Sequence, residues 1–245
     1  MGVPSEDTFL RVFSLLNPKQ FESCFRQWVS RIIPNLSGTS AVDGKTVRGS
    51  GNCGEMAIHM VSAFATRLGV VLGQEKVSAK SNEITAIPEL LDALYLKGFP
   101  VSIDAPKEVA LGHAVGCQRA IVEKIIAKRG DYLLAVKGIQ PKLHHAIQDA
   151  FLDRKDQVVH VDQAEQAHVC IVAQRCSLLP ETGIVSESDW PECAVIARID
   201  SISQVKSKAP SMEQRYHIAS RDFVPAEVAE AVRSHWGVLT ITRAR

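Results

Sequence analysis

Hydrophobic residues follow helical spacing at the start of this chain and mixed spacing afterwards. Two helical stripes come first, at 9–16 and 21–32, and the prolines Pro18 and Pro34 end them. We expect this helical hairpin to carry no catalytic group and its aromatic residues to belong to the core. Further elements are predicted as strands at 40–43, 56–65, 69–78, 99–104 and 131–137, helices at 84–97, 117–128 and 141–152, strand-like segments over 157–219 and a last helix at about 225–236. The order predicts an α/β protein.

Two of the predicted strands end in an aspartate. In the segment AVDGKTVRGS a short apolar strand leads to Asp43, and Gly44 is expected to turn the chain so that Lys45 and Arg48 face the carboxylate. In FPVSIDA a second strand ends in Asp104, after an amphipathic helix. Strand, helix and strand form the unit that builds parallel pairing, so both carboxylates are predicted at one sheet edge.

This pattern suits phosphoryl transfer with two metal ions. Carboxylate oxygens bind Mg²⁺, cations bind phosphate oxygens, and two such metals lie about 4 Å apart. The alternative is structural: a strand-end aspartate such as Asp43 often caps a turn beside solvated basic neighbours. Lys137 ends the strand at 131–137 and could contact a phosphate, although a solvated strand-end lysine is equally typical.

Several segments together resemble one family. They are AVDGKTVRGS, HMVSAFATRLGVVLGQEKVSAKSNEITAIPELLDAL, IDA and GCQ, DYLLAVKGIQPKLH, and RSHWG, in order along nearly the whole chain. They resemble the H-repeat-associated proteins, which are DDE-type transposases of bacterial insertion sequences found beside RHS elements. The resemblance implies a ribonuclease-H-like core that binds Mg²⁺, or Mn²⁺, through two aspartates and one glutamate, and that cuts and rejoins DNA ends. Asp43 and Asp104 fall on the two aspartates and are the predicted catalytic and metal-binding residues, while Lys45, Arg48 and Lys137 are the predicted DNA contacts.

The chain departs from the family pattern at three places. In the family, the third acid follows His-Trp-Gly and one aliphatic residue, and here HWGV is followed by Leu239. Residues 106–115 intervene between the Asp-Ala of the second strand and Gly-Cys-Gln, and Ile139 stands where the lysine motif of the family has asparagine. The family also extends beyond both ends of this chain, so a member shortened at both termini is expected.

The last helix offers no substitute for the missing acid. Glu230 lies nine positions before Leu239, which is roughly 13 Å along a continuing helix, and Glu227 is further away. Because metal–carboxylate bonds are about 2 Å long, neither side chain can bridge that gap. Both glutamates are therefore predicted to lie on a solvated helix face.

Composition limits the size of the core, the kind of DNA contact and the cellular location that can be expected. The chain has 245 residues, 46% of them hydrophobic, which allows a sizeable core in one or two domains. A formal net charge of +1 means that DNA contact would need a local basic patch. The six cysteines have no CxxC spacing and no signal peptide is visible, so reduced thiols in the cytoplasm are expected. No apolar run approaches the ~20 residues that span a membrane.

We therefore expect an α/β protein with a ribonuclease-H-like mixed sheet, flanking helices, an N-terminal helical segment and a β-rich insertion before the last helix. The predicted division is a helical segment over 1–36, the core over 37–155, the insertion over 156–222, and the final helix with a non-family tail over 223–245. The predicted function is that of a DDE-type transposase relative with an incomplete catalytic site, weak Mg²⁺ binding and insertion-sequence DNA as partner. A homo-oligomer is compatible with the sequence. The alternative is a non-catalytic DNA-binding remnant, or a pseudogene product, of an insertion element.

Overall fold

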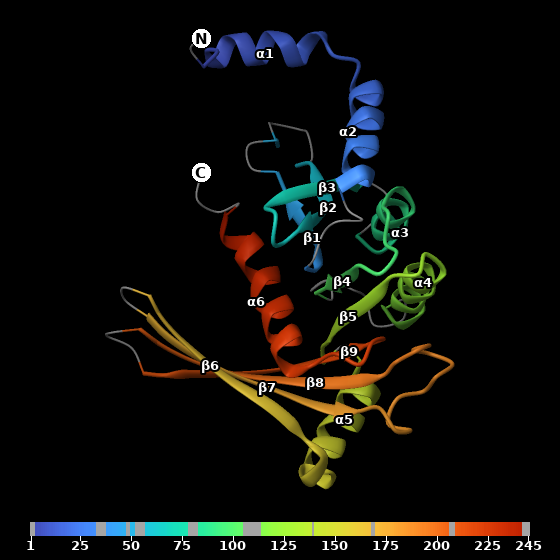
Figure 1. Cartoon of the computed structure of the whole chain (residues 1–245), viewed down its shortest axis with the longest axis vertical. Helices are drawn as coiled ribbons and strands as arrows, with labels where there is room; N and C mark the ends of the chain where they lie inside the picture. Colours follow the sequence, from blue (N-terminus) through green and yellow to red (C-terminus); the bar gives the residue numbers. More distant parts are fainter. Residues whose placement is uncertain are drawn as a thin grey trace.

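The computed structural model describes the chain apart from residues 1–2, 33–37, 48–49, 52–56, 78–82, 105–113, 139, 168–169, 206–208 and 242–245. Within the described residues, one mixed sheet contains nine strands in the order β3-β2-β1-β4-β5-β9-β8-β7-β6 (Figure 1). The strands are β1 (Ser40–Thr46), β2 (His59–Ala65), β3 (Val70–Val77), β4 (Pro100–Ile103), β5 (Asp131–Val136), β6 (Val159–Ala167), β7 (Cys170–Pro180), β8 (Val195–Val205) and β9 (Ser211–Ala219). The helices are α1 (Glu6–Leu15), α2 (Pro18–Ile32), α3 (Glu83–Ala93), α4 (Ala114–Ala127), α5 (Pro141–Asp153) and α6 (Pro225–Ile241), with a short 3₁₀ turn at Lys155–Gln157.

The sheet has a parallel centre between two antiparallel wings. β1, β4 and β5 run parallel, which the helices α3 and α4 make possible as crossover connections. β2 and β3 form a hairpin beside β1, and its turn contains Gly69, which has a positive φ of 68°. On the other side, β9, β8, β7 and β6 form an antiparallel series, and β9 pairs with β5. The β-rich segment therefore continues the same sheet.

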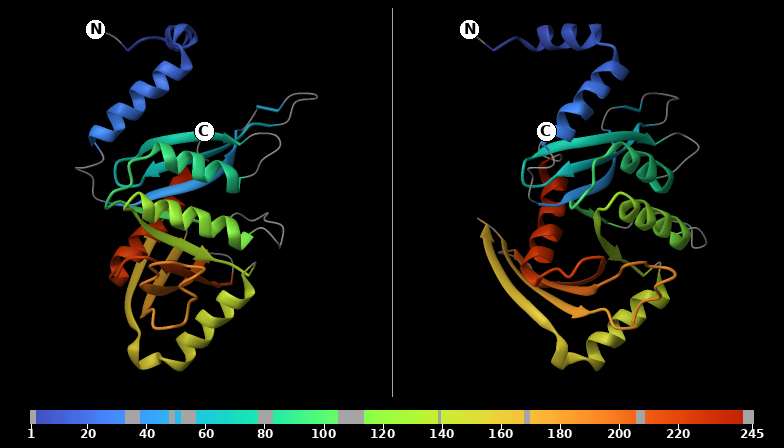
Figure 2. Two further views of the ribbon diagram at one scale, coloured as in Figure 1. Left: turned by 90° about the vertical axis from the view of Figure 1, so that its right-hand side faces the viewer. Right: turned by 45° about the vertical axis from the view of Figure 1, so that its right-hand side comes forward.

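Helices cover both faces of the sheet (Figures 1 and 2). α3 and α4 lie side by side on one face, where Leu90 and Ile125 are fully buried in the larger core cluster. α6 lies on the opposite face, called the α6 face below, where Val228 packs in a second cluster with Leu133 of β5 and Ala219 of β9. Burying such side chains is the main stabilising term, at about 25 cal/mol per Å² of apolar surface.

One local prediction at the candidate site is wrong. Gly44 does not turn the chain, because β1 continues to Thr46 and pairs with β2 along its whole length, including Gly44 with Val61. The partner strand satisfies the backbone groups of Gly44, and this outweighs the turn preference of an isolated glycine. As a result, Asp43 and Lys45 lie two positions apart on one strand, with side chains toward the same face.

The N-terminal prediction is also wrong in part. Asn17 and Pro18 do separate two helices, because the Asn17 side-chain oxygen accepts hydrogen bonds from the backbone at the start of α2. However, α1 has no buried residue and runs across the end of α2, away from the sheet, instead of folding back as a hairpin (Figure 1). Phe13 and Phe21 meet edge to face at this corner, with ring centroids 6.0 Å apart, and both remain about half exposed.

Two other boundaries are adjusted by the structure. The helix predicted at 84–97 ends at Ala93, and Gly98 follows with a positive φ of 69° before β4 begins. The last helix continues beyond Trp236 to Ile241, so that Leu239 belongs to α6. None of the helices in the described part of the chain is long and apolar enough to cross a membrane.

Candidate active site on the α6 face of the sheet

Asp43 and Asp104 lie at the same level of two neighbouring parallel strands. β1 and β4 pair in the register Ser40–Val101, Ala41–Ser102 and Val42–Ile103, so each aspartate is the next residue beyond the last pair. Adjacent strands are about 4.8 Å apart. Parallel pairing, which the sequence predicts from the intervening helix, therefore brings the two aspartates side by side.

The two aspartates share the α6 face of the sheet. Ser102, which is buried in β4, exchanges a 2.9 Å hydrogen bond with Nδ1 of His235 on α6. Side chains of a strand point to one face at every second residue, so Asp104 faces the same way as Ser102. Asp43 is likewise two positions beyond Ala41, the partner of Ser102. Both carboxylates are thus directed to the side on which α6 lies.

Helix α6 carries position 239, where the resemblance to the family leads us to expect a third acid. Residue 239 is four positions after His235, and residues four apart lie on one face of a helix, one turn and about 6 Å along. The backbone of Leu239 is helical, and its side chain lies outside the described residues. Position 239 therefore follows His235 on the helix face that contacts β4.

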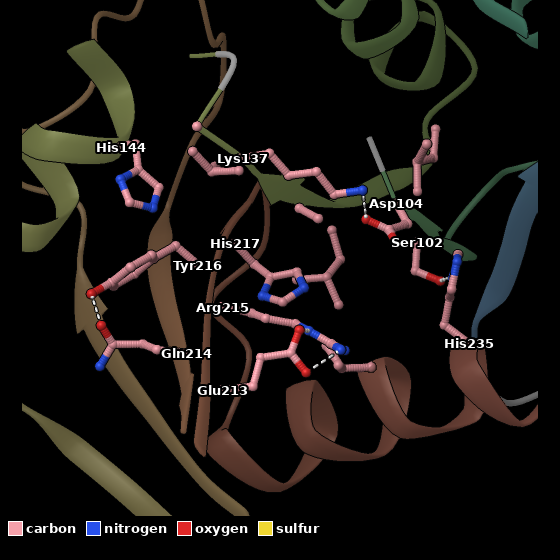
Figure 3. Close-up of a pocket in the computed structure, with 16 residues that line it drawn as sticks. Ser102, Asp104, Lys137, His144, Glu213, Gln214, Arg215, Tyr216, His217 and His235 are labelled. Carbon is pink, nitrogen blue, oxygen red and sulfur yellow. Dashed lines mark hydrogen bonds and ion pairs between the residues drawn. The ribbon is translucent and has the colours of Figure 1, made fainter. Parts of the chain in front are cut away.

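Lys137 forms an ion pair with Asp104. Its Nζ lies 2.7 Å from Asp104 Oδ1, and both side chains are largely buried, at 31% and 22% exposure (Figure 3). β4 and β5 pair in parallel with Ile103 opposite Leu134, so Asp104 stands at the level of Ala135, and Lys137 follows two residues later on the same face. This arrangement gives the second carboxylate an internal cation.

A cavity of about 500 Å³ opens beside this ion pair. β9 runs next to β5, and His217 lies opposite Ala135, which is also at the level of Asp104. The small Ala135 therefore lies between Asp104 and His217 across the sheet. Polar residues line the cavity, among them Ser102, Asp104, Lys137, Tyr216, His217 and His235 (Figure 3). The methyl group of Ala135 leaves this space open.

Two buried histidines face the cavity. Burial lowers the pKa of both His217 and His235 to about 4, although the charge of Asp104 acts in the opposite direction. Both imidazoles are therefore neutral near pH 7. Among the described residues, no hydrogen bond reaches Nδ1 of His217 or Nε2 of His235, and both atoms are buried. Further out, Arg215 is held by two hydrogen bonds to Glu213.

The described residues do not fit a pair of Mg²⁺ ions. Asp43 and Asp104 supply the hard oxygen donors that Mg²⁺ prefers. However, no three His, Cys, Asp or Glu side chains gather into a metal-binding group in the described part of the chain, and the Asp104 carboxylate is bound by the Lys137 ammonium. Position 239 contributes leucine, which has no donor atom.

The remaining predicted residues have separate locations. Lys45 is half-buried in β1, while Arg48, Ile139 and most of the 106–115 insertion lie outside the described residues. Glu230 is 67% exposed, with Arg67 as its neighbour at 4.0 Å, and Glu227 pairs with Arg221. Both glutamates thus lie on the solvated side of α6, as expected.

Sequence reasoning missed the histidines of the cavity. His235 appears in the sequence only as part of HWG, and nothing around His217 marks it, because its approach to Asp104 depends on the pairing of β9 with β5. The position of His217 near the end of a strand-like segment does not identify the residue that it faces.

Comparisons with known proteins identify the family to which the chain is similar. The model of the family described as "Transposase DDE domain" matches residues 35–238. The chain is 38% identical to the "Putative transposase YncI" of Escherichia coli O157:H7, over 96% of this chain and 60% of that protein. It is 36% identical to the "H repeat-associated putative transposase YhhI" of Escherichia coli K12, over 97% of this chain and 63% of that protein. The YncI protein of strain K12 is 51% identical over 61% of this chain and 58% of its own length.

The mixed sheet with flanking helices and the match over residues 35–238 define a DDE transposase domain. The chain belongs to this transposase family, and its relatives include the H-repeat-associated proteins. It spans about three fifths of the length of the curated relatives that it matches most extensively.

Proposed function

We propose that this chain is a DDE-type transposase relative that binds the DNA ends of an insertion sequence and does not cleave them. The observation that carries the proposal is the in-register pairing of β1 and β4, which brings Asp43 and Asp104 together on the α6 face. The order β3-β2-β1-β4-β5, with the last three strands parallel, supports a ribonuclease-H-like core around them.

The catalytic defect follows from residue 239. In an intact relative, a glutamate at this position would complete the set of carboxylates that holds two Mg²⁺ or Mn²⁺ ions for strand cleavage and joining. In this chain leucine provides no donor, and α6 carries Glu230 about 13 Å away along its axis. Each 1.4 kcal/mol of lost transition-state stabilisation slows a reaction about tenfold, so the loss of a ligand is expected to abolish measurable cleavage.

DNA binding does not require that chemistry. Lys45 lies on the same strand and face as Asp43, and Arg48 and Lys137 complete the proposed set of phosphate contacts. Such contacts depend on charge and are independent of DNA sequence. The residues of this chain therefore support DNA binding without catalysis, as expected of a non-catalytic remnant of an insertion element.

Cleavage and binding can be tested on one labelled duplex that carries an H-repeat end. We expect the wild-type protein to shift the duplex at low salt and to leave both strands intact in Mg²⁺ or Mn²⁺. Asp43→Ala and Asp104→Ala serve as matched variants. Cleavage by the wild type that both substitutions abolish would contradict the proposed defect. Failure of the folded protein to bind the duplex at low salt would contradict the proposed DNA binding.

A further inference from the structure

The carboxylate of Asp104 is contacted by a cation of the protein itself, the ammonium group of Lys137. We propose that Lys137 acts as an internal substitute for a divalent metal at Asp104, neutralising the carboxylate and competing with any metal ion for it. The inference rests on the proposed function only in taking Asp104 as the second metal-site carboxylate. It adds a second reason, besides Leu239, to expect weak metal binding.

The position of Lys137 is set by the sheet. β4 and β5 pair in parallel, and both Asp104 and Lys137 follow the ends of their strands on the α6 face. The Nζ–Oδ1 distance of 2.7 Å is that of a charge-assisted hydrogen bond. With 22% exposure of the aspartate and 31% of the lysine, the pair is shielded more than a typical surface ion pair.

The surroundings of Asp104 favour this ion pair. A largely buried carboxylate is costly unless a cation or several hydrogen-bond donors compensate it. Two other groups that line the cavity have observed partners: Arg215 is bound to Glu213 through two hydrogen bonds, and His235 shares a hydrogen bond with Ser102. In the described lining of the cavity, Lys137 is the positively charged side chain with an observed contact to Asp104.

A divalent ion at Asp104 would meet this ammonium directly. It would have to displace Nζ from Oδ1 or share the carboxylate with a like charge a few ångströms away, and either arrangement weakens binding. Replacing Lys137 by methionine keeps an unbranched apolar stem of similar length, one atom shorter, and removes the charge. The Asp104 carboxylate of this variant should then bind a divalent cation more tightly.

The experiment measures Mn²⁺ binding by electron paramagnetic resonance, with no DNA present. We expect Lys137→Met to bind Mn²⁺ about tenfold more tightly than the wild type, and Lys137→Arg, which keeps the charge, to bind as weakly as the wild type. Lys142→Met removes an exposed lysine at the start of α5 and should leave the affinity unchanged. The gain of Lys137→Met should disappear when Asp104→Asn is added.

Each outcome decides the proposal. An unchanged or lower affinity of folded Lys137→Met would overturn it, and the lower value would indicate that Lys137 only holds Asp104 in place. Lys137→Gln gives the same test with a neutral polar side chain if the methionine variant does not fold. A gain that survives Asp104→Asn would also overturn the proposal, because the metal would then lie elsewhere. Because no DNA is used, these results are separate from the tests of binding and cleavage.

Discussion

Ser102 Oγ and His235 Nδ1 lie 2.9 Å apart in a buried hydrogen bond that joins β4 to α6 across 133 positions of sequence. Asp104 follows Ser102 by two residues on the same face of β4, and position 239 follows His235 by one helical turn. This bond therefore sets the level of the last helix relative to the two aspartates. It is the contact through which a third acid on α6 would be aligned with them.

Removing the Ser102 hydroxyl should destabilise the fold. In Ser102→Ala, the buried Nδ1 of His235 loses its partner, and an unsatisfied buried group costs about 1–3 kcal/mol. Urea unfolding should show this decrease in the free energy of unfolding. The control is Ser234→Ala on the same helix, because among the described residues the Ser234 hydroxyl donates to the Ala231 carbonyl within its own helix, and its loss should cost less. Equal effects of the two substitutions would contradict the special role of Ser102.

Acid should destabilise the protein through its two buried histidines. The pKa of His217 and of His235 is about 4 in the folded chain and about 6.5 when unfolded, so the unfolded state binds more protons between these values. Stability is therefore fully present above pH 6.5 and falls as the pH drops toward 4. His217→Gln removes one titrating group and should make this slope shallower by up to about one proton. Unfolding free energies measured from pH 7 to pH 4 test this, and an unchanged slope would show that His217 is not held neutral.

Magnesium should bind weakly to the wild-type protein. Two carboxylates, one of them paired with Lys137, leave the site short of a ligand, so we expect a dissociation constant of ~1 mM or weaker by titration calorimetry. Asp43→Asn should remove the remaining binding. Leu239→Glu adds a carboxylate and should tighten binding about tenfold, equivalent to ~1.4 kcal/mol, whereas Leu239→Gln should not. Tight binding that persists in Asp43→Asn would mean that the metal lies at another place.

DNA binding should depend steeply on salt through the lysines of the site. Each phosphate contact that is removed reduces the slope of log K against log salt concentration by about one. Lys45→Met should therefore bind more weakly at low salt and with a shallower slope than the wild type, as measured by fluorescence anisotropy. Lys155→Met, an exposed lysine of the turn that follows α5, is the matched control. Equal slopes for all three proteins would exclude Lys45 from the contact.

Much of the candidate site could be predicted from local sequence. The apolar runs that end in Asp43 and Asp104, with an amphipathic helix between them, predict two parallel strands, and the structure has these strands in register. The leucine at position 239, which follows HWGV, is read directly from the sequence. These features are local because strand ends, helical spacing and turn residues depend on neighbours within a few positions. Gly44 is the exception, since pairing with β2 overrides its preference for a turn.

The surroundings of the aspartates were decided by the tertiary structure. The ion pair of Lys137 with Asp104 and the approach of His217 depend on which strands lie beside β5, and β9 reaches that place from more than 70 positions along the chain. The exposure of α1 likewise depends on whether any part of the chain packs against its apolar stripe, which the stripe itself does not specify. The sequence alone determined the strand and helix order and the two carboxylates. The pairing of distant strands decided which charges meet, because strand register and helix docking are set by the packing of the whole sheet.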